Sequence, residues 1–342
     1  MFDEARGIFE QLPAVPERTL APGQAVCDLL TAERPFVLRG LVREWPLVQA
    51  GLTSPHQARQ YLLQHDGKQP FEVTIGSPAS SGRIFYRDDM LMNVQMIRAR
   101  LPEVFERIEK HENDDNQPII YLSSVDTRTF FRGLHEANNV AIGRPHYMER
   151  IWIGMRTRIA AHNDFPANLA CVAVGRRRFT VFPPEQFRNL YIGPLDNTPA
   201  GRAVSMVDFL NPDFDKHPRF REAMRHGQVA ELGPGDAIYM PSMWWHHVEG
   251  LERFNILVNY WWRDTPRYLG QPQDALNHAI MSIRDLPDAE KKIWRDMFDY
   301  YVFGDGAEVT AHIPRVEDSI LGRMTPEQAN KIRAYLLKAL NS

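Results

Sequence analysis

Residues 150–164 read RIWIGMRTRIAAHND, and they open a series of short apolar runs separated by turns. The runs that follow are NLACVAVG, RRFTVFPP, QVAELGPGDAIYMP, WWHHVEGL and FNILVNYWW. Several short strands at this spacing are typical of a β-sandwich or a β-barrel. We therefore expect residues 150–263 to form the core of a mainly β protein with flanking helices.

The regions on either side of this core have different patterns. Residues 1–149 contain segments with the apolar period of a helix and segments with that of a strand, so we expect an α/β region that flanks the core. Residues 264–342 follow a helical period and predict a C-terminal helical region. Within the first region, the pattern predicts helices over 25–33, 54–64 and 88–110 and strands over 35–42, 71–76 and 118–125.

Two further segments stand out. Residues 185–227 are polar and aromatic, and we expect a long functional loop or a cap over one end of the core. In the tail, residues 289–301 carry a stripe of large apolar side chains, and Thr325-Pro326-Glu327-Gln328 predicts a capping box that opens a last helix. The stripe consists of Ile293, Trp294, Met297, Phe298 and Tyr301. It either packs on the core or joins a second copy of the chain.

Composition excludes several classes of protein. The chain has 342 residues, and its 40 basic and 43 acidic residues give a net charge of −3, which makes nucleic acid an unlikely partner. Two cysteines, Cys27 and Cys171, cannot build a disulfide framework. No run of 18 apolar residues occurs, and the N-terminus lacks the apolar core of a signal peptide. We expect a cytoplasmic protein without a membrane span.

His162-Asn163-Asp164 offers the first chemical signal. Residues i and i+2 of a strand point to the same face, so one imidazole and one carboxylate are aimed at a common point. Two histidines and one carboxylate form the facial triad that holds Fe(II) with open positions. Such a short motif also occurs in ordinary surface turns, so a third ligand is needed from another strand.

The third ligand can come from His246 or His247, in PSMWWHHVEG. Adjacent residues of a strand face opposite sides, so at most one of the two points inward. The alternative is a histidine pair that simply packs among Trp244 and Trp245.

GRRRFTVFPP at 175–184 singles out one of three arginines. Period-2 alternation puts Arg177 on the face of Phe179 and Val181, which is otherwise apolar, whereas Arg176 and Arg178 share a polar face that can meet water. A buried arginine needs an anionic partner, and its planar guanidinium suits a carboxylate.

Two asparagines are also expected to face inward. Asn168 lies an even number of residues after His162, and Asn259 shares a face with Asn255, Leu257 and Trp261. A buried asparagine is hydrogen-bonded, either to the sheet or to a ligand. Together these polar groups are too many for a plain core, and a metal with a bound dicarboxylate would satisfy them.

Several motifs in a fixed order resemble the jumonji C (cupin-8) group of Fe(II)- and 2-oxoglutarate-dependent oxygenases, in particular its asparaginyl hydroxylase branch. The resemblance is strongest over residues 153–262, and PFVLRGLVREWP and IIYLSS nearer the start also match. The matching pieces are IGM…AHND, FPPEQF, NPDF, PGDAIYMPSMWWHH and VNYWW. The resemblance implies a double-stranded β-helix, the jelly-roll of the cupins.

The resemblance also implies roles for individual residues. His162, Asp164 and the first histidine of the pair, His246, correspond to the metal ligands. Arg177 and Tyr121 correspond to residues that bind the far carboxylate of 2-oxoglutarate. Residues near the co-substrate correspond to Asn168, Asn259 and Trp261, and Tyr86 matches another pocket tyrosine loosely.

This chain departs from the family at two positions. Arg177 stands where the hydroxylase has a lysine, which keeps the charge but reshapes the pocket. Ile159 replaces a threonine three residues before the first ligand, which removes a hydroxyl.

The expected function is therefore Fe(II)- and 2-oxoglutarate-dependent hydroxylation of a C–H bond, or demethylation where the target carbon is an N-methyl. A protein or peptide is the expected substrate, although a small molecule is possible, and the relative's C-terminal helices imply a homodimer. Two alternatives remain open. One is a metal-binding cupin enzyme, an isomerase or dioxygenase, that does not use 2-oxoglutarate. The other is a non-catalytic cupin that serves as a binding module.

Overall fold

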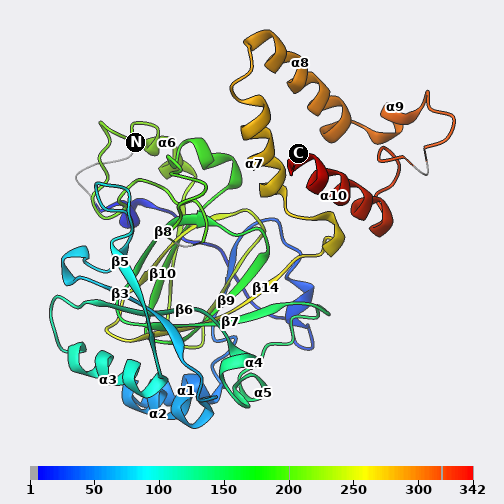
Figure 1. Cartoon of the computed structure of the whole chain (residues 1–342). Coiled ribbons are helices and arrows are strands. Elements are labelled where there is room, and N and C mark those ends of the chain that lie inside the picture. Colours follow the sequence, from blue (N-terminus) through cyan, green and yellow to red (C-terminus); the bar gives the residue numbers. More distant parts are fainter. Residues whose placement is uncertain (1–6, 200, 317–318, 342) are drawn as a thin grey trace. The chain divides into compact units, whose positions relative to one another are not determined.

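The computed structural model describes residues 7–199, 201–316 and 319–341. The chain divides into two compact units, Met1–Arg263 and Asp264–Ser342 (Figure 1). The first unit holds every strand of the described residues, and the second is helical.

Two β-sheets build the first unit. The larger has nine strands in the order β1-β2-β12-β9-β14-β7-β6-β3-β5, and the smaller has five in the order β11-β10-β13-β8-β4. The nine-stranded sheet contains β1 (Glu17–Arg18), β2 (Phe36–Leu38), β12 (Ala237–Met240), β9 (Ala167–Val174), β14 (Asn255–Trp262), β7 (Met148–Gly154), β6 (Ile119–Asp126), β3 (Phe71–Gly76) and β5 (Val94–Ala99). The five-stranded sheet contains β11 (Gln228–Leu232), β10 (Arg177–Phe182), β13 (Trp245–Gly250), β8 (Arg158–Asn163) and β4 (Arg83–Ile84).

Strands β7 to β14 form the predicted double-stranded β-helix. Along the chain they visit the large sheet, the small sheet, the large sheet, twice the small sheet, then large, small and large again. Alternate residues of these strands face the space between the sheets and form an apolar core that includes Val172, Phe179, Val181 and Ile238. The expected fold class, a mainly β jelly-roll core with a C-terminal helical region, is confirmed.

Helices cover the outer face of the large sheet, as Figure 1 shows. They are α1 (Pro46–Thr53), α2 (Pro55–His65), α3 (Leu101–His111), α4 (Thr127–Phe130) and α5 (Leu134–Ala137). The prediction at 54–64 is confirmed, because the Ser54 side chain caps α2 by accepting the N–H of Gln57. Strands β3 and β6 likewise match their predicted ranges closely.

Two predictions in this region are wrong. The helix expected over 88–110 is a strand, β5, followed by the shorter helix α3. Its apolar spacing is compatible with either structure, and pairing with β3 decides for the strand. The helix expected over 25–33 is only a 3-10 turn at Val26–Asp28. The strand expected over 35–42 is short, since β2 ends before Gly40, which has a positive φ of 67°.

The insert at 185–227 packs on the outer face of the small sheet. It contains a 3-10 helix, Pro184–Arg188, and α6 (Phe220–His226). Its apolar residues form a cluster with Phe182 and Trp245 of the sheet. The outer face of β10 is therefore largely covered, so that Thr180 is fully buried rather than facing water.

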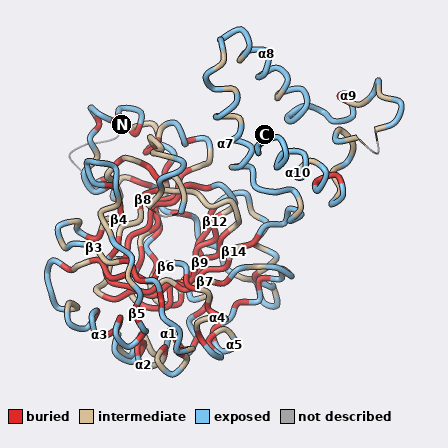
Figure 2. The backbone as a smooth tube through the Cα atoms, viewed as in Figure 1, coloured by how far each residue is buried: buried red, intermediate tan, exposed pale blue. Residues whose placement is uncertain are grey.

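The C-terminal unit contains four α-helices among its described residues: α7 (Pro272–Ile283), α8 (Asp288–Phe298), α9 (Gly306–Thr310) and α10 (Pro326–Leu340). A π-helical turn, Asp299–Phe303, extends α8. The predicted capping box at the start of α10 is present. Most residues of this unit are exposed, as the pale blue tube in Figure 2 shows. No helix of the described residues has the length and apolar character needed to cross a membrane.

Candidate functional site

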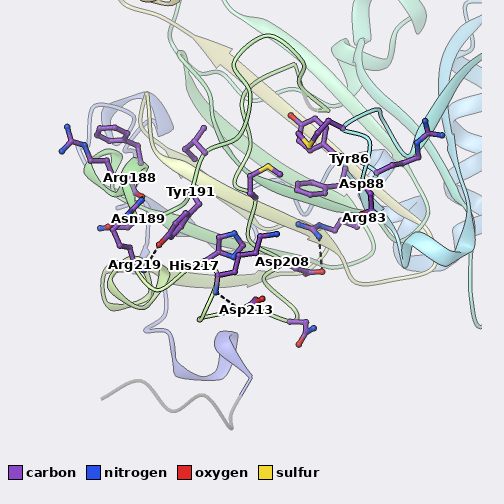
Figure 3. Close-up of a pocket in the computed structure, with 18 residues that line it drawn as sticks. Arg83, Tyr86, Asp88, Arg188, Asn189, Tyr191, Asp208, Asp213, His217 and Arg219 are labelled. Atoms are coloured by element: carbon purple, nitrogen blue, oxygen red, sulfur yellow. Dashed lines mark hydrogen bonds and ion pairs between the residues drawn. The ribbon is translucent and has the colours of Figure 1, made fainter. Parts of the chain in front are cut away.

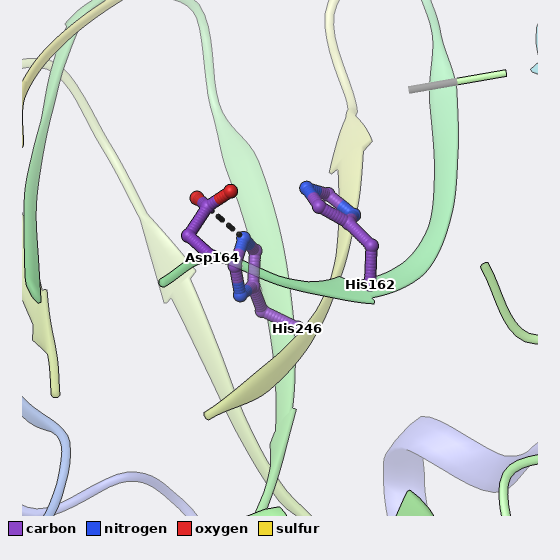
Figure 4. Close-up of side chains that lie close together, drawn as sticks. All are labelled: His162, Asp164 and His246. Atoms are coloured by element: carbon purple, nitrogen blue, oxygen red, sulfur yellow. Dashed lines mark ion pairs between the residues drawn. The ribbon is translucent and has the colours of Figure 1, made fainter. Parts of the chain in front are cut away.

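Three side chains converge where the small sheet meets the core: His162 of β8, Asp164 in the turn after it, and His246 of β13 (Figure 4). Strands β8 and β13 are antiparallel, and their register puts His246 directly opposite His162. One ligand atom of each of the three residues lies within 4.8 Å of the others. Two imidazoles and one carboxylate at this separation can hold a divalent transition metal on one face.

Backbone contacts fix the orientation of both imidazoles. Nδ1 of His162 lies 2.9 Å from the carbonyl oxygen of Ala160, and Nδ1 of His246 lies 3.0 Å from that of Trp244. A carbonyl oxygen only accepts, so both Nδ1 atoms donate and both Nε2 atoms keep a free lone pair. Metal-binding histidines are commonly held by such a second hydrogen bond.

The electrostatics of the cluster suit a metal. Burial, with the neighbouring His246, lowers the pKa of His162 to about 4, so this imidazole is neutral near pH 7. Burial opposes ionisation of Asp164, but the interactions of this carboxyl with His246, His162 and Arg202 outweigh it and lower its pKa. Oδ2 of Asp164 is buried and lies 3.5 Å from Nε2 of His246 without a well-formed hydrogen bond. A neutral imidazole and an underused carboxylate oxygen are what a bound cation needs.

His247 points away from this cluster, as strand alternation requires. Its ring stacks on Phe209 at 4.6 Å between centroids and more loosely on Phe9 at 6.4 Å. Burial, with the positive charge of Arg158, lowers the pKa of His247 to about 3. The residues alone left the choice between His246 and His247 open, and the structure brings His246 into the cluster.

A cavity of about 540 Å³, here called the central cavity, adjoins the three residues. Arg177 lines it from β10 and is only 2% exposed, which agrees with its predicted position on the inner face. Burial lowers the pKa of Arg177, and its main polar partner is the hydroxyl of buried Tyr121. The Nε atom of Arg177 is buried without a hydrogen-bond partner, and no carboxylate of the described residues pairs with this cation.

The two asparagines also line the central cavity and contact each other. Nδ2 of Asn259 donates to Oδ1 of Asn168 at 3.3 Å, and Trp152 donates to Oδ1 of Asn259 at 2.9 Å. Asn168 and His162 do not share one regular strand, because β8 ends at Asn163 and β9 begins at Ala167. The two residues face each other from opposite sheets. Trp261 completes this wall, and its buried Nε1 has no hydrogen-bond partner in the described part of the chain.

Other residues of the central cavity were missed by sequence reasoning. Trp152 lies between Ile151 and Ile153, which are buried on the opposite face of the strand. Strand alternation therefore predicts that Trp152 points into the cavity. No local signal marks Ser123 and Ser124 as lining residues. Ile159 also lines the cavity.

Tyr86 does not line the central cavity. It lines a neighbouring one, and its hydroxyl donates to the carbonyl oxygen of Asn197.

Comparison with known proteins gives a consistent result. A family model described as "Cupin-like domain" matches residues 23–268. HSPB1-associated protein 1 of Homo sapiens is 29% identical over 141 residues, which cover 41% of this chain and 28% of that protein. Lysine-specific demethylase 8 of Xenopus tropicalis is 26% identical over 241 residues, which cover 68% of this chain and 49% of that protein. The tRNA wybutosine-synthesizing protein 5 of Gallus gallus is 31% identical over 142 residues, which cover 37% of this chain and 42% of that protein. The chain thus spans less than half of each of these relatives.

The buried state of His247 predicts a pH dependence of stability in the metal-free protein. In the unfolded chain its pKa is about 6.5, whereas in the fold it is about 3. As pH falls through this window, the unfolded chain takes up a proton that the fold does not, so the free energy of unfolding falls. His247→Phe should reduce the change in the free energy of unfolding with pH by up to about 1.4 kcal/mol per pH unit. Urea denaturation between pH 7 and pH 4 measures it.

His278→Gln, on the exposed surface of α7, controls for the loss of a histidine as such. Parallel stability curves for the wild type and His247→Phe would contradict the assigned burial of a neutral imidazole.

Proposed function

Because the chain belongs to the cupin-like domain family, we propose that it is an Fe(II)- and 2-oxoglutarate-dependent oxygenase that hydroxylates a C–H bond. The observation that carries the proposal is the cluster of His162, Asp164 and His246 beside a cavity that contains the unpaired cation of Arg177. In this proposal, residues 150–263 are the catalytic core, 1–149 flank it, and 264–342 form a dimerisation region.

The three clustered residues are the proposed iron ligands. Two imidazole nitrogens and one carboxylate oxygen would hold the ion and leave positions for exchangeable ligands. This donor set suits Fe(II) better than a structural zinc site, which would close all four positions with protein groups. When bound, Fe(II) with 2-oxoglutarate supplies the O₂-dependent oxidation of a C–H bond.

Arg177 and Tyr121 are the proposed anchors for the far carboxylate of 2-oxoglutarate. In the sheet, Val181 pairs with His246 and Arg177 pairs with Gly250. Arg177 is therefore four residues along β10 from Val181, the residue opposite His246. That separation is about 13 Å of backbone, which leaves room for an arginine side chain and a short dicarboxylate between them. A guanidinium in a dry cavity binds a carboxylate strongly because both are desolvated.

The rest of the central cavity has two proposed roles. Asn168, Asn259 and Trp261 carry polar groups that orient the co-substrate, since the buried Nε1 of Trp261 and the asparagine amides face the same space. Apolar neighbours such as Phe179, Leu257 and Val248 keep water out, which protects the oxidation from side reactions.

A protein side chain is the proposed substrate. One relative is named a lysine-specific demethylase, whereas another is named for tRNA wybutosine synthesis. The net charge of −3 favours protein over nucleic acid. Both cysteines, Cys27 and Cys171, are free, which fits the proposed reducing, cytoplasmic location.

Removing a proposed iron ligand tests the metal site. His162→Ala and Asp164→Ala should abolish Fe(II) binding, because two protein ligands do not hold the ion against water. Metal content after anaerobic reconstitution measures this, and circular dichroism checks that the fold is retained. His247→Phe is the matched control, since its ring lies outside the cluster, and it should bind Fe(II) like the wild type. Wild-type affinity in either alanine variant would refute the ligand assignment.

Arg177 tests the co-substrate. Losing one partner of a buried charge pair costs about 3–5 kcal/mol, so Arg177→Gln should weaken 2-oxoglutarate binding by a factor of hundreds or more and spare the metal. Arg177→Lys keeps the charge and should retain most of the affinity. Exposed Arg176→Gln should change little. Calorimetric titration into the anaerobic Mn(II) protein gives these values. A wild type that binds no 2-oxoglutarate at millimolar concentration would leave the metal-binding cupin enzyme as the better explanation.

A homodimer is the second part of the proposal, and the exposed apolar surface of the C-terminal unit supports it. Neither α7 nor α8 has a buried residue. Trp294 is 41% exposed, Tyr301 50% and Phe303 76%. Exposed large apolar side chains in this number are typical of an interface, and a second copy of the chain would bury them with two-fold symmetry.

Charge introduced on this surface tests the dimer. Trp294→Glu combined with Phe303→Glu in the full chain should give a monomer by light scattering, because two carboxylates would be buried at the interface. Arg295→Glu, on the same helix, is the control for the change of charge. A double variant that stays dimeric would refute this interface, as would a truncation at about residue 265 that stays dimeric.

A further inference from the structure

A second cavity, of about 1220 Å³, lies outside the central cavity (Figure 3). We call it the arginine cavity, because arginines line it from both sides. Residues 83–90 form one side, and residues of the insert between Phe187 and Arg219 form the other. Its volume exceeds the roughly 300–1,000 Å³ of typical small-molecule pockets, so it suits an extended ligand.

The two cavities are lined by neighbouring residues of the same segments. Arg83, Phe85 and Tyr86 line the arginine cavity, whereas Ile84 and Met92 of the same segment line the central cavity. On the insert side, Tyr86 donates to the carbonyl oxygen of Asn197, and Thr198 and Pro199 next to it line the central cavity. A ligand in the arginine cavity is therefore next to the space where the target carbon would react.

Three cations at this cavity form no ion pair among the described residues. Arg188 and Lys216 are both exposed, although the charge of Asp213 also acts on Lys216. The guanidinium of Arg219 donates to the carbonyl oxygen of Arg188, at 3.1 Å. Of the three lining acids, Asp208 pairs with Arg83, whereas Asp88 and Asp213 are exposed. Five cations therefore line the cavity against three carboxylates: Arg83, Arg87, Arg188, Lys216 and Arg219.

His217 adds a buried polar group to the same wall. It is 8% exposed, and its Nδ1 atom has no hydrogen-bond partner among the described residues. Its ring stands edge-on to Tyr191 at 4.8 Å between centroids, on the lining of the cavity. An unsatisfied buried ring nitrogen is costly.

The aromatic residues of the cavity disfavour nucleic acid as the ligand. Proteins bind single strands by stacking bases on open aromatic faces. Here Arg83 covers Phe85 at 3.7 Å, Arg219 covers Tyr191 at 4.5 Å, and Arg188 lies 5.4 Å from the ring of Phe187. Here the rings hold guanidinium groups in place for an anion and are not open to a base.

We propose that the arginine cavity binds an acidic peptide segment, which flanks the hydroxylated residue of a protein substrate. This inference rests on the proposed oxygenase function, because it places the acidic flank beside the site of reaction. Arg188, Lys216 and Arg219 bind the peptide carboxylates. The cavity determines substrate specificity by charge, whereas the central cavity determines the chemistry.

Fluorescence anisotropy of the metal-free protein tests this binding directly, with a fluorescein-labelled oligo-glutamate peptide at low ionic strength. The wild type should bind it, and Arg188→Gln combined with Lys216→Gln should weaken binding about tenfold, as expected for two exposed charges. Arg107→Gln combined with Lys110→Gln removes two exposed cations of α3 and should leave binding unchanged.

Several outcomes would overturn the proposal. One is an oligo-glutamate peptide that does not bind, and another is equal weakening in the α3 control, which would mean long-range attraction only. Tighter binding of a labelled oligo-uridylate with the same dependence on Arg188 and Lys216 would assign the cavity to nucleic acid. Fe(II) and 2-oxoglutarate affinities of the Arg188 and Lys216 variant should equal those of the wild type. Failure of the oxygenase proposal would appear in those affinities, and failure of the peptide site in the anisotropy.

Discussion

The pairing of His162 with His246 across two antiparallel strands is the constraint on which the proposed site depends. These residues are far apart in the chain, and only the register of β8 and β13 brings their imidazoles together. A slip of one residue would bring His247 to the inner face and bury His246 among aromatic rings. The aromatic contacts of His247 with Phe209 and Phe9 therefore help to hold the register.

The fold and much of the site could be predicted from the sequence because both depend on strand alternation. Period 2 identified Arg177 among three consecutive arginines and gave the inward direction of Asn259. Period 2 gave a wrong argument where the residues compared do not belong to one regular strand. Asn168 does face the cavity, but from a different strand in the opposite sheet, so the even offset from His162 led to the correct face for the wrong reason.

Tertiary contacts explain the remaining errors. The segment 94–99 has apolar residues that suit a helix or a strand, and only its pairing with β3 decides between them. Thr180 is buried because the insert covers its face of the sheet, and no local sequence pattern predicts that contact. The same holds for the arginine cavity, whose two sides are separated by about a third of the chain and meet only in the folded protein.

The position of the insert has a consequence for how this protein can evolve. It connects β10 to β11, two neighbours in the small sheet, and most of its apolar residues pack on the outer face of that sheet. Residues of the insert that line only the arginine cavity, such as Arg188 and Lys216, can therefore change without moving β8 against β13, whereas Phe209 is constrained by its contact with His247. Mutations there alter what is recognised, while the residues proposed to carry out the oxidation keep their geometry. Selection can thus act on the two properties separately, and related chains can diverge in their targets while they share one reaction.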